Sequence, residues 1–465
     1  MIPLLTAEET RRAEEAYEGS LDELMERAGA AVAHGVLDSY EGRVAVVCGA
    51  GNNGGDGRVC ARVLREAGRE VTVIEKFGEL DQPDVIVDAL LGVGLHDAPR
   101  EDVARMIGRI NGAGVPVVSV DVPSGVNAST GEVAGAAIHA EATVTFGAAK
   151  DGLAVSPGRA HAGQVVVAGI GLRGRPEHEH SLVAASALQD VPRKGHGSTK
   201  YSAGSVLVVG GSRGLTGAAM LTTLAAFRAD AGYVTVAAPE SSLPVLETRL
   251  LEAVKRPLPE DSGGRLLPRA ADAILEAASK ANAVAIGPGL GRSDGTVELV
   301  RILLEQLEVP VVLDADALWS LEPFSRVAPT VLTPHAGELA RLLGIESSAV
   351  NAHRLDAVRR AASRFGSVVL LKGSDTLVAK PRGGVLVSLY GEPSLATAGS
   401  GDVLTGIVAA FLAKGLEAQT AAALAATAHG VASKLVPDQA GLVASDLLPG
   451  IQRAIAGDGW QFPAV

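Results

Sequence analysis

The sequence contains few cysteines and few aromatic residues. Its two cysteines, Cys48 and Cys60, cannot form a disulfide framework in a chain of 465 residues, so a disulfide-rich secreted scaffold is excluded. Cys48 ends an apolar run, which favours a buried structural thiol. Aromatic residues make up 3% of the chain and hydrophobic residues 47%, so we expect cores that are built mainly from Ala, Val and Leu.

Long apolar runs and an excess of positive charge are missing as well. No stretch approaches the roughly 18 apolar residues of a membrane span, and Met1–Arg12 has no apolar core of signal-peptide length. The formal net charge of −12 disfavours nucleic acids and anionic membranes as main partners, although it is compatible with a local basic site for a phosphorylated ligand. We therefore expect a cytoplasmic protein with small-molecule partners, no nucleic-acid partner and no membrane attachment, and we expect a homo-oligomer.

Short apolar runs alternate with helical segments along the whole chain. Runs with so little internal polarity are typical of parallel strands that are covered on both faces, so we predict an α/β protein. At this length two to three domains are expected, the first of them a Rossmann-like, doubly wound parallel sheet. The predicted strands are Val44–Cys48, Val71–Ile74, Val85–Leu90, Val115–Val120 and Thr143–Phe146, followed by Ser205–Val209, Val234–Ala238, Ala283–Ile286, Val311–Leu313, Val331–Leu332 and Val368–Leu371.

A polar, aperiodic segment at residues 173–180 separates the two halves, and we interpret it as a linker. The domains are then expected to span residues 1–175 and 185–460. His178 and His180 lie in this segment, but no third ligand accompanies them, so a metal site is not expected there. The glycine-rich loops of the two halves differ in spacing, so no internal repeat is predicted.

The segment Thr397–Gly406 has the composition of an anion site. Gly399 and Gly401 allow backbone N–H groups to turn toward one point, and the N-terminus of a helix expected at Asp402–Lys414 adds partial positive charge there. An Asp beside a bound phosphate can deprotonate an attacking hydroxyl, so the segment suggests phosphoryl transfer to a small alcohol. The alternative is a capped helix start with glycines that serve a tight turn.

A second glycine-rich loop, Gly49–Gly57, follows the first predicted strand and precedes a helix expected at Gly57–Ala67. Its position is that of a dinucleotide phosphate loop, but its two Asn and one Asp break the G-x-G-x-x-G pattern. Such a loop can bind sugar hydroxyls, phosphate or a hard monovalent cation; alternatively, its Asn and Gly residues serve only a tight turn.

Two further strands of the first half end in polar loops. Asp88 is followed by Gly92 and Gly94, and Asp121 by Ser124 and Gly125. Ligands of open parallel sheets bind at the carboxyl ends of the strands, so three polar loops at this edge predict a site.

Four segments of the first half match a known family in order and spacing: Leu24–Gly29, Gly51–Gly57, Asp88–Gly94 and Asp121–Gly125. They resemble the NAD(P)H-hydrate epimerase domain. The second half resembles the ADP-dependent NAD(P)H-hydrate dehydratase, which implies a ribokinase-like fold for it. Over nearly its whole length the chain resembles the bifunctional nicotinamide nucleotide repair enzymes of prokaryotes.

The resemblance implies the site residues of the first half. Asp121 would be the acid–base group, and a potassium ion would be held by Asn53, Asp88 and Ser124, whose oxygens suit a hard cation. The hydrated nucleotide would be bound by Asn52, Asn53, Gly54, Gly55, Asp56, Gly92, Val93, Gly94, Leu95, His96, Asp97, Ala98 and Asp121.

For the second half the resemblance implies Asp402 as the catalytic base. The substrate would be bound by Ala218, Gly289, His335 and Asp402. ADP, as co-substrate with a magnesium ion, would be bound by Lys372, Gly373, Ser374, Asp375, Thr376, Ala398, Gly399, Ser400 and Gly401.

The implied activity is repair of hydrated nicotinamide nucleotides, in which the first domain interconverts the R and S forms at C6 and the second dehydrates the S form, converting ADP to AMP and phosphate. One alternative keeps the fold but makes the second domain a kinase of a vitamin alcohol, fused to a nucleotide-binding module. Another makes the chain a binding or scaffold protein, which predicts damaged polar loops, whereas here they are complete.

Overall fold

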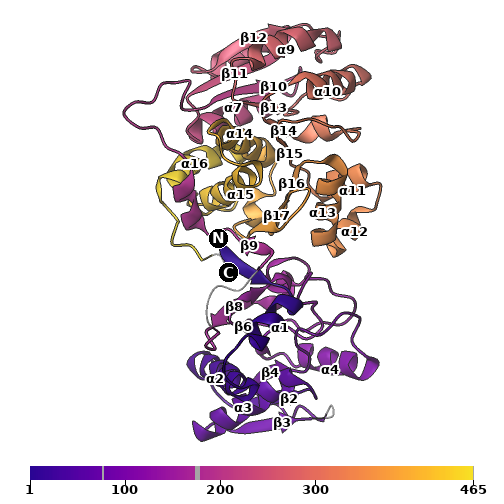
Figure 1. The fold of residues 1–465 in the computed structure, drawn as a ribbon, viewed down its shortest axis with the longest axis vertical. Helices are drawn as coiled ribbons and strands as arrows, with labels where there is room; N and C mark the ends of the chain where they lie inside the picture. The colour runs from indigo at the N-terminus through magenta and orange to yellow at the C-terminus, as the bar shows by residue number, and fades with distance from the viewer. Residues whose placement is uncertain (76–77, 173–177, 464–465) are drawn as a thin grey trace. The chain divides into compact units, whose positions relative to one another are not determined.

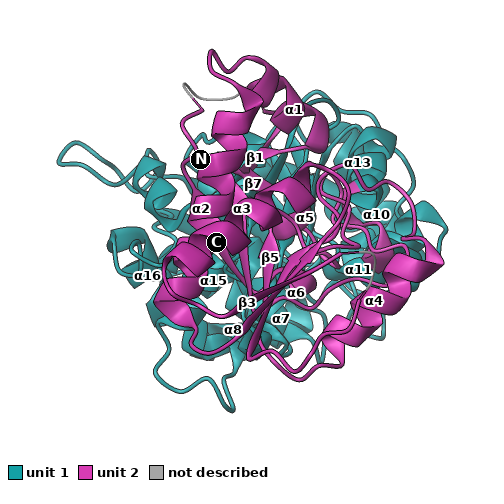
Figure 2. Ribbon diagram, turned by 90° about the horizontal axis from the view of Figure 1, so that it is seen from below, with its two compact units in different colours: residues 1, 182–350, 356–464 teal, residues 2–181, 351–355, 465 magenta. Residues whose placement is uncertain are grey.

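The computed structural model describes residues 1–75, 78–172 and 178–463 (Figure 1). The chain forms two compact units (Figure 2). The first unit comprises residues 2–181 with 351–355, and the second comprises residues 182–350 and 356–463. None of the helices in the described part of the chain combines the length and the apolar character that a membrane crossing requires.

The first unit contains the doubly wound parallel sheet that the sequence predicts. Its six strands are ordered β3-β2-β4-β5-β6-β8 and all adjacent pairs are parallel. Alternate residues of β2 enter separate cores: Val46 packs in the core that includes α2 and α3, and Val47 in the core that includes α4. The strands of this sheet are β2 (Val44–Cys48), β3 (Val71–Ile74), β4 (Val85–Ala89), β5 (Val117–Val120), β6 (Ala142–Phe146) and β8 (Gln164–Ala168); β1 (Ile2–Leu5) and β7 (Ala149–Lys150) lie outside it and pair with each other in parallel. The helices are α1 (Ala7–Glu15), α2 (Leu21–Ser39), α3 (Asn52–Glu66), α4 (Glu101–Asn111), α5 (Asp151–Ala154) and α6 (Arg159–Ala162).

Two features of this unit follow from its local sequence. Thr6 caps α1 and forms a capping box with Glu9. Cys48 is buried, and burial raises the pKa of its thiol to about 11, as a structural thiol requires.

The second unit is built on a larger sheet, ordered β12-β11-β10-β13-β14-β15-β16-β17-β18. Its strands are parallel from β12 to β16, and the last two pairings are antiparallel. The strands are β10 (Ser205–Val209), β11 (Tyr233–Pro239), β12 (Val254–Leu258), β13 (Ala283–Ile286), β14 (Val311–Leu313), β15 (Thr330–Leu332), β16 (Val368–Leu371), β17 (Thr376–Ala379) and β18 (Val385–Ser388), and the helices are α7 (Thr216–Arg228), α8 (Leu243–Arg249), α9 (Ala271–Ala278), α10 (Asp294–Gln306), α11 (Ala336–Leu343), α12 (Ser347–Ala352), α13 (Arg354–Phe365), α14 (Ser400–Ala413), α15 (Ala418–Lys434) and α16 (Leu447–Ala456).

Both glycine-rich helices begin earlier than predicted. α3 begins at Asn52 and α14 at Ser400, so Asn52–Asp56 and Ser400–Gly401 are helical rather than parts of loops. Gly and Asn have low helix propensity, which is why the sequence favoured loops, but the N–H groups of a first turn have no intrahelical acceptor and can bind an anion.

The linker prediction was wrong at its C-terminal end, and its residues 173–177 lie outside the described residues. His180 begins β9 (His180–Leu182), is 2% exposed, and places Nδ1 3.0 Å from Oδ2 of Asp151. The reason is tertiary, because this buried carboxylate comes from a segment 29 residues away.

Candidate active sites

The first unit places a buried ion pair at the carboxyl end of its sheet. Asp121 directly follows β5, and its Oδ1 accepts hydrogen bonds from Nζ of Lys150 at 2.6 Å and from Oγ1 of Thr145 at 2.8 Å. The Lys150 side chain is fully buried, and its Nζ also donates to Oγ1 of Thr145 and to the carbonyl of Phe146. Asp121 has a φ of +65°, which is uncommon for a non-glycine residue and is typical of functional sites.

Sequence reasoning missed Lys150. A lysine four residues after the apolar run Ala142–Phe146 could have been noticed, because lysine is almost never fully buried unless it is paired. Its partner, however, lies 29 residues away and could be identified only from the structure.

The charge of Asp121 also affects two further carboxyl groups, those of Asp56 and Glu14. Burial raises the pKa of Asp56 to about 8, and the charges of Asp121 and Glu14 add to this effect. Burial, followed by the charge of Asp121, also raises the pKa of Glu14, which sequence reasoning did not select. At neutral pH Asp56 therefore retains a proton, whereas Asp121 is paired with an ammonium group. A proton donor and a proton acceptor in one site are what acid–base chemistry requires.

Asp88 and Ser124 are in direct contact, and Asn53 lies beside them. Oγ of Ser124 donates to Asp88 at 2.6 Å, and Leu91 N donates to Oγ of Ser124. Nδ2 of Asn53 donates to the carbonyl of Leu91, which also accepts from Ser124. Burial raises the pKa of Asp88, and in the described part of the chain this carboxylate has no cationic side-chain partner.

The segment 92–98 extends from this cluster as an irregular loop. A Cβ atom on Gly92 would lie 3.2 Å from Cβ of Asn53, so the loop begins against the first turn of α3. Further along, Gly94 and the residues 96–98 are exposed.

In the second unit, the predicted substrate residues Ala218 and Gly289 are neighbours. A Cβ on Gly289, where φ is +61°, would lie 2.3 Å from the carbonyl oxygen of Leu215 and 3.2 Å from Cβ of Ala218. Only glycine allows this close approach of the two loops.

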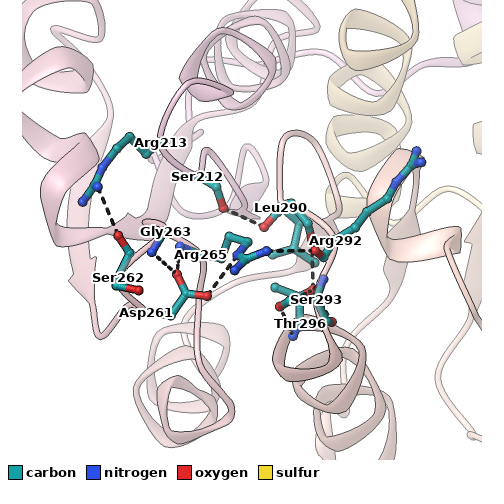
Figure 3. Close-up of polar contacts among 11 residues, drawn as sticks. Ser212, Arg213, Asp261, Ser262, Gly263, Arg265, Leu290, Arg292, Ser293 and Thr296 are labelled. Carbon is teal, nitrogen blue, oxygen red and sulfur yellow. Dashed lines mark hydrogen bonds and ion pairs between the residues drawn. The ribbon is translucent and has the colours of Figure 1, made fainter.

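Hydrogen bonds fix the loop that carries Gly289. Oγ of Ser212 donates to the Leu290 carbonyl at 2.6 Å, and Arg265 connects Asp261 to the carbonyl of Arg292 (Figure 3). The backbone N–H of Gly291 donates to Asp316. These contacts fix the backbone of the loop that carries Gly289.

The predicted anion segment contacts a cationic side chain. Gly399 precedes α14 with a φ of +90°, and Oγ of Ser400 donates to the Leu395 carbonyl. A Cβ on Gly401 would lie 3.1 Å from Nζ of Lys372, so the ammonium group touches the first turn of α14. A phosphate at this point would meet helix N–H groups and a lysine together.

Asp402 lies in that same first turn. A Cβ on Gly399 would lie 3.9 Å from Oδ2 of Asp402, and Oγ1 of Thr222 in α7 donates to the Asp402 carbonyl. Burial raises the pKa of Asp402 to about 7; the charge of Asp314 adds to this rise and that of Lys372 opposes it. A carboxylate with this pKa is well matched to act as a base near neutral pH.

The other residues that the sequence predicts to bind the nucleotide adjoin Lys372. Gly373–Asp375 connect β16 to β17, and Oγ1 of Thr376 donates to the Gly373 carbonyl. Lys372 N donates to the Pro334 carbonyl, which places Lys372 beside the segment that contains His335. His335 caps α11, where its Nδ1 accepts from Gly337 N, so it has a structural function whatever ligand it binds.

Fold and sites together define the class: an α/β enzyme with a polar site that contains carboxylates on each unit, the second on a ribokinase-like fold. The family model for the NAD(P)H-hydrate dehydratase matches residues 206–455. The family model for the YjeF-related protein N-terminus matches residues 21–83 and 74–152. A bifunctional NAD(P)H-hydrate repair enzyme of Moorella thermoacetica is 40% identical over 91% of this chain and 90% of its own length, and one from Escherichia coli is 34% identical over 94% and 90%. The chain belongs to the family of bifunctional NAD(P)H-hydrate repair enzymes.

Solved structures agree with the second unit. The ADP/ATP-dependent NAD(P)H-hydrate dehydratase of Bacillus subtilis, co-crystallised with ATP and Mg²⁺, has a TM-score of 0.52 and 28% identity, over 58% of this chain and 95% of that chain. A ribokinase-like superfamily protein of Enterococcus faecalis, with a TM-score of 0.53 and 23% identity over 61% and 98%, shares the fold.

Proposed function

We propose that residues 1–175 epimerise hydrated NADH and NADPH at C6, and that residues 185–460 dehydrate the S form in an ADP-dependent reaction. The observation that carries this proposal is the placement of Asp402 in a first helical turn that also touches Lys372. Both units would act on one substrate, since hydration of the ring from either face yields both epimers and a chiral dehydratase site accepts one. The nucleotide-binding and substrate-binding roles that the sequence predicts for residues of both halves are part of this proposal.

The dehydration step needs a better leaving group than hydroxide. Asp402 removes the proton of the C6 hydroxyl, whose oxygen attacks the β-phosphorus of ADP and displaces AMP. The C6 phosphate then leaves with its C–O bonding pair, the ring loses a proton from C5, and the C5=C6 double bond of the dihydronicotinamide is restored. Lys372 and the N–H groups of Gly399–Gly401 stabilise the charge of the phosphate.

Magnesium fits this site through the phosphates rather than through a protein cage. No group of three or more His, Cys, Asp and Glu side chains with metal-binding geometry occurs among the described residues. Mg²⁺ commonly keeps several waters and binds phosphate oxygens with one or two carboxylates. When bound it would neutralise charge on the phosphates.

In the first unit, Asp121 would take the proton of the C6 hydroxyl while the C6–N1 bond breaks, leaving an aldehyde at C6 and its bonding electron pair on N1, where Asp56 would supply a proton. Reclosure of N1 onto the other face of the aldehyde would invert C6 and return both protons. Lys150 orients Asp121 through its hydrogen bond to Oδ1, and burial leaves Asp56 with a protonated carboxyl beside it. The first turn of α3 directs N–H groups at the nucleotide.

Potassium fits the Asp88 cluster. Asp88, Ser124 and Asn53 offer carboxylate, hydroxyl and amide oxygens, and a monovalent cation would neutralise the buried charge of Asp88. We expect KCl at about 100 times its Kd to raise the melting temperature of the first unit by roughly 5–10 °C relative to LiCl at equal ionic strength. Differential scanning calorimetry measures this, and Asp88→Asn should abolish the difference. Equal melting temperatures of the parent protein in the two salts would reject the site.

The test of the proposed function is to mix R and S hydrates of NADH with the full chain, ADP, MgCl₂ and KCl. Recovery of the dihydronicotinamide absorbance from both epimers, with one AMP and one phosphate formed per NADH, is the expected result. Recovery from the S form alone would show that the first unit does not epimerise. A stable phosphoester of another alcohol, formed from ATP, would favour the kinase alternative instead.

A further inference from the structure

Asp314 is a buried carboxylate that the proposed reaction does not use directly. It follows β14 and is 1% exposed. Its Oδ1 accepts from Nζ of Lys372 at 2.6 Å and from Oγ1 of Thr333 at 2.8 Å, and its Oδ2 accepts from Oγ1 of Thr405 at 2.7 Å. Both oxygens are therefore engaged, and neither is needed to contact a substrate.

The partners of Asp314 come from separate segments of the site. Thr333 follows β15, Lys372 follows β16, and Thr405 lies in α14 one turn after Asp402. The backbone takes part as well: Asp314 N donates to the Ile286 carbonyl, and a Cβ on Gly287 would lie 1.8 Å from the Asp314 carbonyl oxygen. Asp314 thus fixes the relative positions of the loop after β13, the Lys372 side chain and helix α14.

The lysine is held at the edge of the protein interior. Its side chain is 22% exposed while that of Asp314 is 2% exposed, so the carboxylate lies behind the ammonium group on the buried side. A Cβ on Gly401 would lie 3.1 Å from Nζ of Lys372 and 3.8 Å from Oδ2 of Asp314. The Lys372 ammonium group therefore lies between the Asp314 carboxylate and the backbone of Gly401, which is proposed to bind the phosphate.

We propose that Asp314 is a positioning residue, which aims the Lys372 ammonium group at the transferred phosphoryl group and locks the first turn of α14, including Asp402, to the same point. This inference rests on the proposed dehydration. It assigns to Asp314 a contribution to turnover rather than to ADP affinity, because a carboxylate behind a lysine orients that lysine but also reduces the positive charge that attracts phosphate.

Asp314→Asn removes the charge and preserves the size of the side chain. We expect kcat for dehydration to fall by about 100-fold, with a KM for ADP that is equal to or below that of the parent protein. The acidic limb of the kcat profile should move to lower pH, because Asp402 loses a negative neighbour. The other charged groups that act on Asp402, Lys372 and Asp316, are retained, as are Glu338 and His429 around Lys372.

Asp230→Asn is the matched control. Asp230 also accepts from two lysines, Lys194 and Lys414, and belongs to the same unit, but it lies at the far end of α7 from Ala218. Its φ is +69°, which Asn tolerates. This variant should leave kcat, KM and the pH limb at parent values, so that a general loss of stability is separated from loss of positioning.

A readout without turnover keeps the inference testable if the proposed function fails. The ¹³Cε resonance of Lys372, assigned with Lys372→Arg, reports the pKa of its ammonium group. Burial lowers this pKa, but the charges of Asp314 and Glu338 outweigh burial and raise it, so it should fall in Asp314→Asn and stay in Asp230→Asn. Three results for Asp314→Asn would each overturn the positioning role: an unchanged Lys372 pKa, a kcat within twofold of the parent value, or a lower kcat without a shift of the acidic limb of its pH profile. If the parent protein itself did not dehydrate the hydrate, the proposed function alone would be rejected.

Discussion

Asp402→Asn is expected to lower ADP-dependent dehydration by about 1,000-fold, which corresponds to about 4 kcal/mol of transition-state stabilisation. The amide keeps the shape of the carboxyl but cannot take the proton of the attacking hydroxyl. The dehydration rate is measured as the recovery of NADH absorbance from the S hydrate. ADP binding, measured by calorimetry, should persist in the variant, because Lys372 and Gly399–Gly401 are unchanged.

The pH profile provides a check on the same assignment. Because burial raises the pKa of Asp402 to about 7, this group carries a proton below that pH and cannot act as a base. Dehydration by the parent protein should therefore fall about tenfold for each pH unit below 7. Parent-level turnover in Asp402→Asn, or a flat profile between pH 5 and 8, would show that another group is the base.

Asp121→Asn is expected to lower epimerisation by about 100- to 1,000-fold, because the amide cannot take the proton of the C6 hydroxyl. Asn accepts the positive φ of this position, so the backbone should be preserved. The measurement is the conversion of R to S hydrate in the absence of ADP, monitored by chromatography. It reports the activity of the first unit alone, because the dehydratase then has no co-substrate.

Lys150→Met extends this prediction to a residue that the sequence did not indicate. Methionine fills the volume of the buried lysine but leaves Asp121 without its cation, so epimerisation should again fall and the first unit should lose about 3–5 kcal/mol of stability. Asp102→Asn on the exposed first turn of α4 is the control and should retain activity. Epimerisation at the parent rate in Asp121→Asn would remove Asp121 from the mechanism.

The sheets and the site loops were accessible from the sequence, because their signals are local. A short, uninterrupted apolar run such as Val44–Cys48 is typical of a parallel strand that is buried on both faces, and the predicted boundaries of this strand agree with the structure. Likewise Asp88 and Asp121 follow strands, and all parallel strands present their carboxyl ends at one edge. The helix starts were predicted less well, because the propensity of Gly and Asn opposes the tertiary contacts that extend α3 and α14.

The sequence by itself determined the α/β architecture, the family and the polar loops that carry Asp121 and Asp402. Only the tertiary structure decided which side chains meet there. Lys150 reaches Asp121 across 29 residues, and Lys372 reaches Asp314 across 58. Nothing in the local sequence around a lysine or an aspartate specifies such a partner, because a buried ion pair is stabilised by the interior that encloses both groups, and that interior exists only in the folded chain.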